Sequence, residues 1–261
     1  MLRRARLTVA YDGTSFHGFA ENDGVRTVMG ELREAIEKVV RQHVDLVGAG
    51  RTDAGVHGWG QVVSCDLPDD SDLEALVRRV NRMCGPDVIA RAAAWTESDF
   101  SARFSAKWRH YRYDIWNAPQ PNPFLAARSW HVISPLSLPT LRLTCDPLIG
   151  EHDFSSFCRR PKAVVREDGQ LQEEPSMTRN VMLARWSEMP SDYGPGLLRF
   201  EIRGNAFCHQ MVRSIVGTMV DAGTGRLNAG DIRGILLAKD RQVAGQVAPP
   251  HGLCLWEVGY D

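Results

Sequence analysis

Two long amphipathic segments, one in each half of the chain, most constrain the fold. Residues 28–41 and 206–222 carry apolar side chains at helical spacing along one stripe, so each predicts a helix that packs against other structure. Thr27 precedes the first segment as an N-cap, and Gly223 follows the second where a C-cap glycine belongs. A capping-box pattern at residues 71–74 predicts the start of a third helix.

Alternating segments typical of strands lie on both sides of these helices, at residues 6–11, 61–67, 88–95, 108–117, 197–203 and 253–258. Each half thus offers strands that flank a long helix, which favours an α+β fold of two similar lobes with largely antiparallel sheets. We place the N-terminal lobe at residues 1–100 and the C-terminal lobe at residues 101–261. Residues 159–178 are expected to form an exposed, mobile loop, and Pro147 should end or kink the helix expected before Gly150.

The composition is that of an ordinary globular protein. The 261 residues have a formal net charge of -1, so the bulk charge does not indicate a nucleic-acid-binding protein. The six cysteines form no C-x-x-C pair, which gives no zinc or redox spacing, and free thiols suit a reducing cytoplasm. Neither an 18-residue apolar run nor a signal-peptide pattern is present, so we expect no membrane association.

The densest chemical pattern is the glycine-rich segment from Gly48 to Val62, which contains Arg51, Asp53 and His57. Glycines let a backbone approach a ligand closely, and a carboxylate held in such a loop can serve as a nucleophile or a general base. From the residues alone, an ordinary surface turn with Arg51 paired to Asp53 is an equally good interpretation. One Asp and one His at this spacing do not make a metal site.

The segment GRTDAGVH followed by GQV resembles the central motif of the bacterial tRNA pseudouridine synthase A family. Other segments resemble the family's pattern in the same order along nearly the whole chain: YDGTSFHGF, VNRMCGPDVI, FSARFSAKWRHYRYDIWN, GEHDFSSF, NAFCHQMVRSIVGTMVDAG and PPHGLCL. The chain departs from the pattern after Gly18, where Phe19 and Ala20 replace the usual Trp-Gln pair.

The resemblance implies the pseudouridine synthase fold, with an active-site cleft between the two lobes. It implies an isomerase that converts uridine to pseudouridine at positions 38, 39 and 40 of the tRNA anticodon stem-loop. Neither a cofactor nor a metal would be required. The partner would be tRNA, and the protein would act as a homodimer in the cytoplasm.

The resemblance also assigns roles to individual residues. Asp53 would be the catalytic carboxylate, which attacks either the base or the sugar. Tyr111 would stack on the target base or transfer a proton, and Arg213 would pair with the Asp53 carboxylate. Arg51 would fill the stack that the extruded base vacates, with a simple partner for Asp53 as its alternative role. Leu255 would form an apolar wall of the pocket, or belong to the ordinary core.

Basic residues interleaved with aromatic ones are expected to bind the RNA, namely Arg103, Lys107, Arg109, His110 and Arg112 with Phe104, Trp108 and Tyr111. A solvated strand edge is the alternative. His57, His110 and His209 are interpreted as structural histidines or phosphate contacts. Two other classes of function stay open: an RNA-binding protein without catalysis, and a small-molecule hydrolase that uses Asp53, although no nucleophilic Ser or Cys motif is present.

Overall fold

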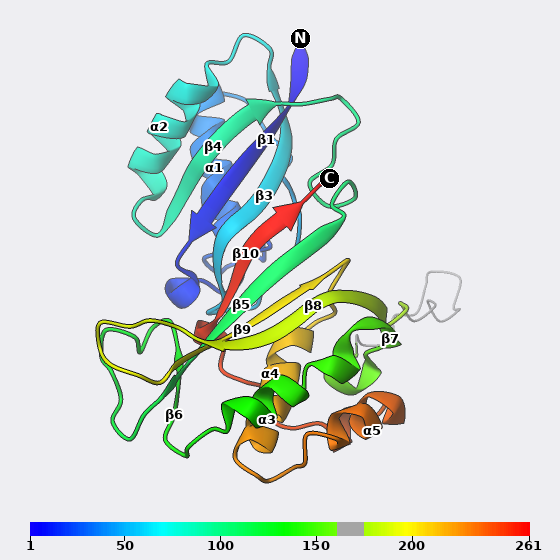
Figure 1. Ribbon diagram of the computed structural model, residues 1–261. Coiled ribbons are helices and arrows are strands. Elements are labelled where there is room, and N and C mark those ends of the chain that lie inside the picture. The colour runs from blue at the N-terminus through cyan, green and yellow to red at the C-terminus, as the bar shows by residue number, and fades with distance from the viewer. Residues whose placement is uncertain (161–174) are drawn as a thin grey trace. The chain divides into compact units, whose positions relative to one another are not determined.

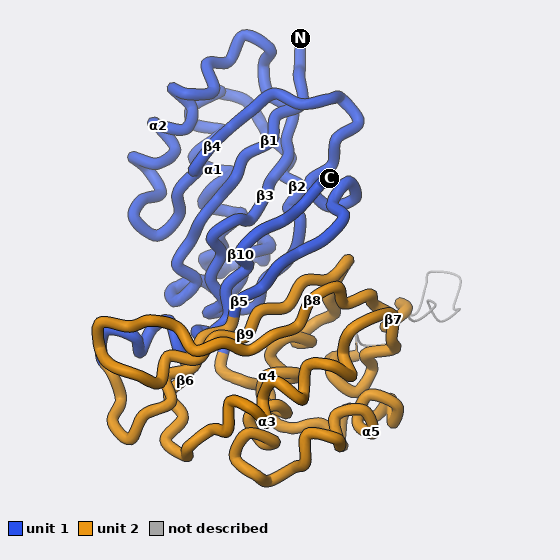
Figure 2. Tube along the Cα trace, viewed as in Figure 1, with its two compact units in different colours: residues 1–112, 123–129, 250–261 blue, residues 113–122, 130–249 orange. Residues whose placement is uncertain are grey.

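The computed structural model describes residues 1–160 and 175–261, which form two compact units (Figure 2). Unit 1 contains residues 1–112, 123–129 and 250–261, and unit 2 contains residues 113–122 and 130–249. The units are not consecutive stretches of the chain, because unit 1 continues past residue 100 and includes the C-terminal strand. The predicted α+β class is confirmed, and most strand pairs are antiparallel.

Unit 1 contains a sheet made of β1 (Leu2–Tyr11), β2 (Val47–Gly48), β3 (His57–Pro68), β4 (Val88–Trp95), β10 (Leu253–Gly259) and the first residues of β5 (Trp108–Asn117). The strand order is β4-β1-β3-β10-β5, and β2 pairs with β3. β1 runs antiparallel to both β3 and β4, whereas β10 lies parallel to β3. The parallel pair brings the C-terminal strand next to the strand that follows the glycine-rich segment.

Helices α1 (Val28–Val40) and α2 (Leu73–Cys84) cover one face of this sheet (Figure 1). As predicted, Thr27 caps α1, since its hydroxyl oxygen accepts from the N–H of Gly30. In α2 the cap is Asp72, whose carboxylate accepts from the N–H of Ala75 at 2.9 Å.

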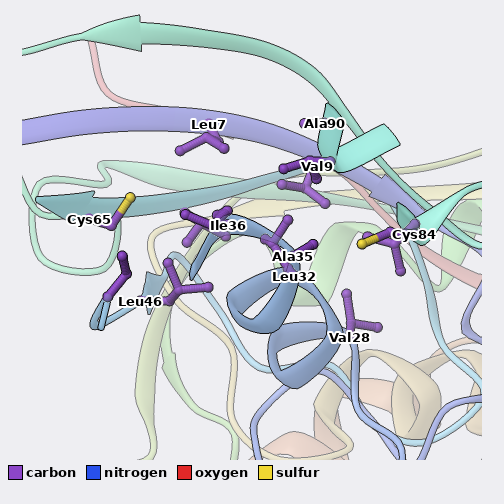
Figure 3. Packing of buried hydrophobic residues seen from close by; sticks show 14 of the residues in the cluster. Leu7, Val9, Val28, Leu32, Ala35, Ile36, Leu46, Cys65, Cys84 and Ala90 are labelled. Atoms are coloured by element: carbon purple, nitrogen blue, oxygen red, sulfur yellow. The ribbon is translucent and has the colours of Figure 1, made fainter. Parts of the chain in front are cut away.

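The core of unit 1 forms where α1 meets the sheet. Figure 3 shows Leu32 and Ile36 of α1 packed with Leu7 and Val9 of β1, and all four side chains are fully buried. Burying each such side chain contributes roughly 1.5–3 kcal/mol to stability. The apolar stripe of residues 28–41 therefore packs against the sheet, as its helical spacing predicts.

Unit 2 contains the rest of β5 with β6 (Trp130–Val132), β7 (Gly150–Asp153), β8 (Thr178–Glu188) and β9 (Leu197–Gly204). Its strand order is β5-β9-β8-β7, and β6 lies parallel to β5. Its helices are α3 (Leu138–Leu143), α4 (Met211–Gly223) and α5 (Asp231–Ala238). Eleven of the thirteen residues of α4 are buried, so α4 is the central helix of the unit.

Three predicted boundaries were wrong by four or five residues, and the first is the start of β1, which lies at Leu2 and not at Arg6. β3 begins at His57, not at Gln61, because glycine allows close packing there: a Cβ on Gly58 would lie 2.4 Å from the Tyr11 ring. α4 begins at Met211, not at Ala206, because Gln210 has a left-handed φ of 64°. The helix expected before Gly150 does end early, and α3 is followed by a short 3-10 turn that contains Pro147.

The cysteines form no C-x-x-C pair, but not all of them are free thiols. Cys158 and Cys208, fifty residues apart, form a disulfide with a Cα–Cα distance of 5.7 Å. Local spacing could not show this pair because the fold brings the two segments together. The expected loop at 159–178 lies largely outside the described residues. Within the described ranges, no helix is long and apolar enough to cross a membrane.

Candidate active site

The loop that carries Asp53 (residues 49–56, the Asp53 loop) joins β2 to β3 and is held through its own carbonyl groups. Gln61 Nε2 donates to the Gly50 carbonyl at 2.8 Å, and Arg109 Nη2 donates to the Ala49 carbonyl at 2.9 Å. Gln61 is fully buried, and its Oε1 accepts from the N–H of Val62 at 3.1 Å. Because buried polar groups are costly to leave unpaired, these bonds fix the first part of the loop.

Thr52, the residue before Asp53, is held from two sides. Its hydroxyl shares a 2.8 Å hydrogen bond with the hydroxyl of Tyr11, and its carbonyl accepts from the N–H of Phe19 at 3.1 Å. Gly18 has a φ of 106°, and a Cβ there would lie 3.1 Å from the Thr52 carbonyl oxygen. A glycine is therefore needed for this close approach. These contacts join the YDGTSFHGF segment to the GRTDAGVH segment.

Asp53 opens a tight turn at the end of the loop. Its carbonyl accepts from the N–H of Val56 at 3.1 Å, and Gly55 within the turn has a φ of 77°. A Cβ on Gly55 would lie 3.0 Å from Pro250 Cγ, so the turn packs against the segment before β10. The Asp53 side chain is half-buried, and its backbone is fixed on both sides. The arrangement presents one carboxylate from a rigid scaffold, which nucleophilic or general-base chemistry requires.

Tyr111 shares the electrostatic environment of Asp53. A Cβ on Gly50 would lie 3.9 Å from the Tyr111 hydroxyl oxygen, which places the phenol beside the Asp53 loop. Burial raises the pKa of Tyr111 to about 12; the positive charge of Arg109 opposes this rise and the negative charge of Asp53 adds to it. At neutral pH the side chain is therefore a protonated phenol that can donate a hydrogen bond.

Arg109 serves the protein's own backbone. Besides the Ala49 carbonyl, its guanidinium donates to the carbonyls of Arg103 at 2.8 Å and Ala106 at 3.3 Å. Burial lowers the pKa of Arg109, and the nearby Tyr111 partly offsets this effect. Three carbonyl contacts show that this predicted RNA-binding residue also joins β5 to the Asp53 loop.

Two other predicted RNA contacts of this segment, Arg103 and Lys107, are exposed. Arg103 lies over the ring of Phe104, with 5.2 Å from its guanidinium carbon to the ring centroid, and Phe104 is 80% exposed. Lys107 is exposed as well, and its backbone N–H donates to the Gly259 carbonyl at 2.9 Å. Both side chains have the accessibility that a phosphate contact needs.

Leu255 and Arg51 occupy contrasting positions. Leu255 is fully buried in β10, where it pairs with Gly58 of β3. Arg51 is exposed on the Asp53 loop. The burial of Leu255 is that of a core residue, and the exposure of Arg51 leaves its guanidinium accessible from solvent.

Arg213 belongs to unit 2 and lies in the first turn of α4. Its Nε donates to the Ala248 carbonyl at 2.8 Å, and its own carbonyl accepts from the N–H of Ala248 at 3.1 Å. Tyr113 donates to the Pro249 carbonyl at 2.8 Å, and it is fully buried. Burial raises the pKa of Tyr113. Tyr113 is thus a core aromatic residue of β5, and Arg213 is fixed against the 248–249 segment.

The structure contains a stack of two arginines and two tryptophans that was not predicted from the sequence. Arg91 lies 3.9 Å over the ring of Trp59, Trp59 stacks on Trp256 with centroids 5.8 Å apart, and Arg112 lies 3.7 Å over Trp256. Arg112 follows Tyr111 directly in β5, so the two side chains point to opposite faces of the strand. The predicted basic-aromatic set is therefore divided between two faces of β5.

His57 has the contacts of a structural histidine. It is 3% exposed, its Nδ1 accepts from the N–H of Gly13 at 3.1 Å, and its Nε2 lies 3.0 Å from the Ala127 carbonyl and 3.1 Å from the His251 carbonyl. Two carbonyls at Nε2 require a proton there, and Nδ1 also lies 3.2 Å from Asp12 Oδ1. Among the described residues, no group of three or more His, Cys, Asp or Glu could hold a metal ion.

The chain is similar over nearly its whole length to known proteins of one family. The family model described as tRNA pseudouridine synthase matches residues 7–105 and 145–261. The tRNA pseudouridine synthase A of Anoxybacillus flavithermus is 38% identical over 261 residues and covers 100% of both chains. That of Geobacillus kaustophilus is 37% identical and covers 100% of this chain and 96% of its own. That of Cutibacterium acnes is also 37% identical, covering 99% and 89%. The chain therefore belongs to the tRNA pseudouridine synthase family.

Proposed function

We propose that this tRNA pseudouridine synthase isomerises uridines 38, 39 and 40 of the tRNA anticodon stem-loop, with Asp53 as the catalytic carboxylate. The observation that carries the proposal is the scaffold of the Asp53 loop, in which Gln61, Arg109 and Tyr11 fix the residues on the N-terminal side of the carboxylate. The specific positions and the cytoplasmic homodimer rest on the resemblance of the motifs.

The reaction rearranges one nucleoside and consumes no second substrate. The C1′–N1 bond breaks, the base turns, and a C1′–C5 bond forms; N1 gains a proton and C5 loses one. The target base lies in a stem-loop, so it must leave its stack before a protein side chain reaches C1′ or the ring. Asp53 then attacks either the sugar or the base, and a loop held in place keeps the carboxylate from moving between the two bond changes.

Tyr111 acts in this scheme as a neutral group. Because its phenol stays protonated, it stacks against the extruded base and donates a hydrogen bond, while Asp53 is the basic group of the pair. Arg51 enters the gap left by the extruded base, for which its exposure suits it. Two further roles are those that the resemblance implies. Arg213 is the cation that pairs with the Asp53 carboxylate, and Leu255 forms an apolar wall of the pocket. Arg103 and Lys107 contact phosphates, and Arg109 contributes positive charge beside them.

The test uses unmodified tRNA with uridine at positions 38, 39 and 40, with EDTA present, and maps pseudouridine by base-specific chemistry. The wild-type protein is expected to form product, and Asp53→Asn is expected to bind the tRNA with similar affinity and form none. Asp45→Asn is the matched control, because the Asp45 side chain is 95% exposed and lies outside the Asp53 loop. Binding without product by the wild type would favour an RNA-binding protein without catalysis. No binding would favour a small-molecule enzyme.

A further inference from the structure

The Cys158–Cys208 pair lies outside the candidate active site and in unit 2. Cys158 follows the short 3-10 helix Ser155–Phe157 and is fully buried, whereas Cys208 is partly exposed. The Cα–Cα distance of 5.7 Å is inside the range that a disulfide spans without backbone movement. The other cysteines, Cys65, Cys84, Cys145 and Cys254, do not take part in a disulfide among the described residues.

The disulfide joins a rigid segment to an irregular one. On the Cys158 side, the Ser156 hydroxyl donates to the Ile235 carbonyl and accepts from the N–H of Asp240, which ties the 3-10 helix to α5 and the residues that follow it. On the Cys208 side, residues 205–210 connect β9 to α4 without regular secondary structure. The bond therefore attaches this connection to a part of unit 2 that is already fixed.

Hydrogen bonds assist the disulfide at both ends of the connection. Asn205 exchanges bonds with Asn180 of β8, since its N–H donates to the Asn180 carbonyl and its side-chain oxygen accepts from the Asn180 N–H, both at 3.0 Å. The carbonyl of His209 accepts from the N–H of Arg159 at 3.0 Å. Gln210 then enters α4 in a left-handed conformation without a side-chain cap, and the tether at Cys208 lies two residues before it.

Residues 205–210 position the first turn of α4, which contains Arg213. Arg213 is held only two residues after Met211, whose N–H donates to the Cys208 carbonyl at 3.1 Å. Displacement of residue 208 would therefore be transmitted through this bond to the helix start. A change at the disulfide thus has a short structural route to a residue assigned to the active site.

We propose that Cys158 and Cys208 form a reversible thiol–disulfide exchange site for low-molecular-weight thiols of the glutathione class, and that its closure fixes the start of α4. The proposal rests on the proposed function, which includes the cytoplasm as the location of the protein. In this reducing compartment, protein disulfides are as a rule transient and redox-sensing. The exposure of Cys208 sets the order of events. An external thiolate attacks the Cys208 sulfur, forms a mixed disulfide with it, and releases Cys158 as the thiolate.

A second external thiol completes the reduction. Its thiolate attacks the external sulfur of the mixed disulfide, which releases Cys208 as a thiolate and leaves the oxidised external disulfide. Two electrons pass from the two external thiols to the protein disulfide, and their two protons end on Cys158 and Cys208. Oxidation by the external disulfide is the reverse sequence, so no other oxidant is required.

The first measurement needs no activity. The full-length protein is equilibrated in glutathione buffers from fully reduced to fully oxidised, quenched with acid, denatured, alkylated and weighed. We expect six alkylated cysteines in the reduced form and four in the oxidised form, in one transition. Cys208→Ser should abolish this transition, and Cys158→Ser should leave only a mixed disulfide between Cys208 and glutathione, which the mass identifies. Six free thiols throughout, or bonds that involve other cysteines, would overturn the proposal. Cys84→Ser is the control and should keep the transition, with five alkylated cysteines in the reduced form and three in the oxidised form.

The second measurement asks whether the bond fixes α4. Amide hydrogen exchange of residues 205–213 should be faster in the reduced form. The rate of tRNA turnover should be lower in the reduced form by about threefold or more, a decrease larger than the scatter of the assay. Cys208→Ser should match the reduced form in every buffer. Equal exchange in both forms would contradict the structural role. Absence of product from both forms, with the exchange difference intact, would count against the proposed function alone.

Discussion

Replacing Gln61 with leucine is predicted to damage the active site through the backbone. The substitution keeps most of the side-chain volume but removes the donor to the Gly50 carbonyl and the acceptor for the Val62 N–H. The Gln61 side chain is fully buried and Val62 is buried, whereas Gly50 is partly exposed, so the Val62 N–H carries most of the cost. An unsatisfied buried group costs about 1–3 kcal/mol, so we expect a total loss of about 2–4 kcal/mol in the free energy of unfolding.

The catalytic effect should exceed what destabilisation explains. A free Gly50 carbonyl allows the Asp53 loop to shift, and a loss of about 1.4 kcal/mol in transition-state stabilisation corresponds to a tenfold fall in rate. Single-turnover rates under saturating protein, at a temperature where both proteins are folded by circular dichroism, would report this fall. Gln61→Glu retains the acceptor for Val62 and loses the amide donor, so it should be slow as well.

The control for this experiment is Gln120→Leu, since Gln120 is exposed in unit 2 and should lose neither stability nor rate. A Gln61→Leu protein that melts at the wild-type temperature and reacts at the wild-type rate would refute the reasoning. Loss of stability with an unchanged single-turnover rate would show that Gln61 supports the fold but does not position Asp53.

Three further predictions follow from the same contacts. Thr52→Val removes one of the two side-chain partners of the buried Tyr11 hydroxyl, the other being Gln61, and should lower the free energy of unfolding by about 1–2 kcal/mol in urea titrations, whereas Thr14→Val in the exposed turn should not. Because the pKa of Tyr111 is raised to about 12, its phenol is protonated below that value; Tyr111→Phe should lower the rate between about pH 6 and 9 by a constant factor, and a pH-dependent ratio to wild type would contradict a neutral Tyr111. Cys208→Ser should have a free energy of unfolding that is lower than that of the oxidised wild type by up to about 4 kcal/mol, because the bond closes a loop of some fifty residues. Denaturant unfolding of the full-length protein measures this difference, and equal midpoints would show that the bond does not constrain the unfolded chain.

The strands and helices that could be predicted are those whose burial follows a local period. The stripe that contains Leu32 and Ile36 is buried along one face of α1, and the alternation of Tyr111 and Tyr113 in β5 was predicted with the correct bounds. The strands β6, β7 and β8 were not predicted. β6 has only three residues and β7 only four, which is too short for a pattern to be recognised.

The active-site support could not be predicted, because its partners are distant in sequence. Tyr11 and Thr52 are forty-one residues apart, and Arg109 reaches Ala49 from sixty residues away. No local period encodes such a pair. The motif predicted which residues occur together, whereas the structure shows the physical reason: the carbonyls of the Asp53 loop need donors, and the surrounding strands supply them. The same limit hid the Cys158–Cys208 bond.

The position of β10 has a consequence for how the molecule is made. β10 is synthesised after every residue of unit 2, yet it pairs with β3, and the segment before it packs on Gly55 and accepts a bond from His57. While the ribosome is still translating unit 2, the nascent unit 1 has α1, α2 and most of its core but lacks this strand. The turn that holds Asp53 can therefore be completed only after residues 250–259 have left the exit tunnel. A nascent chain released before that point would carry the whole GRTDAGVH motif without the packing that shapes it.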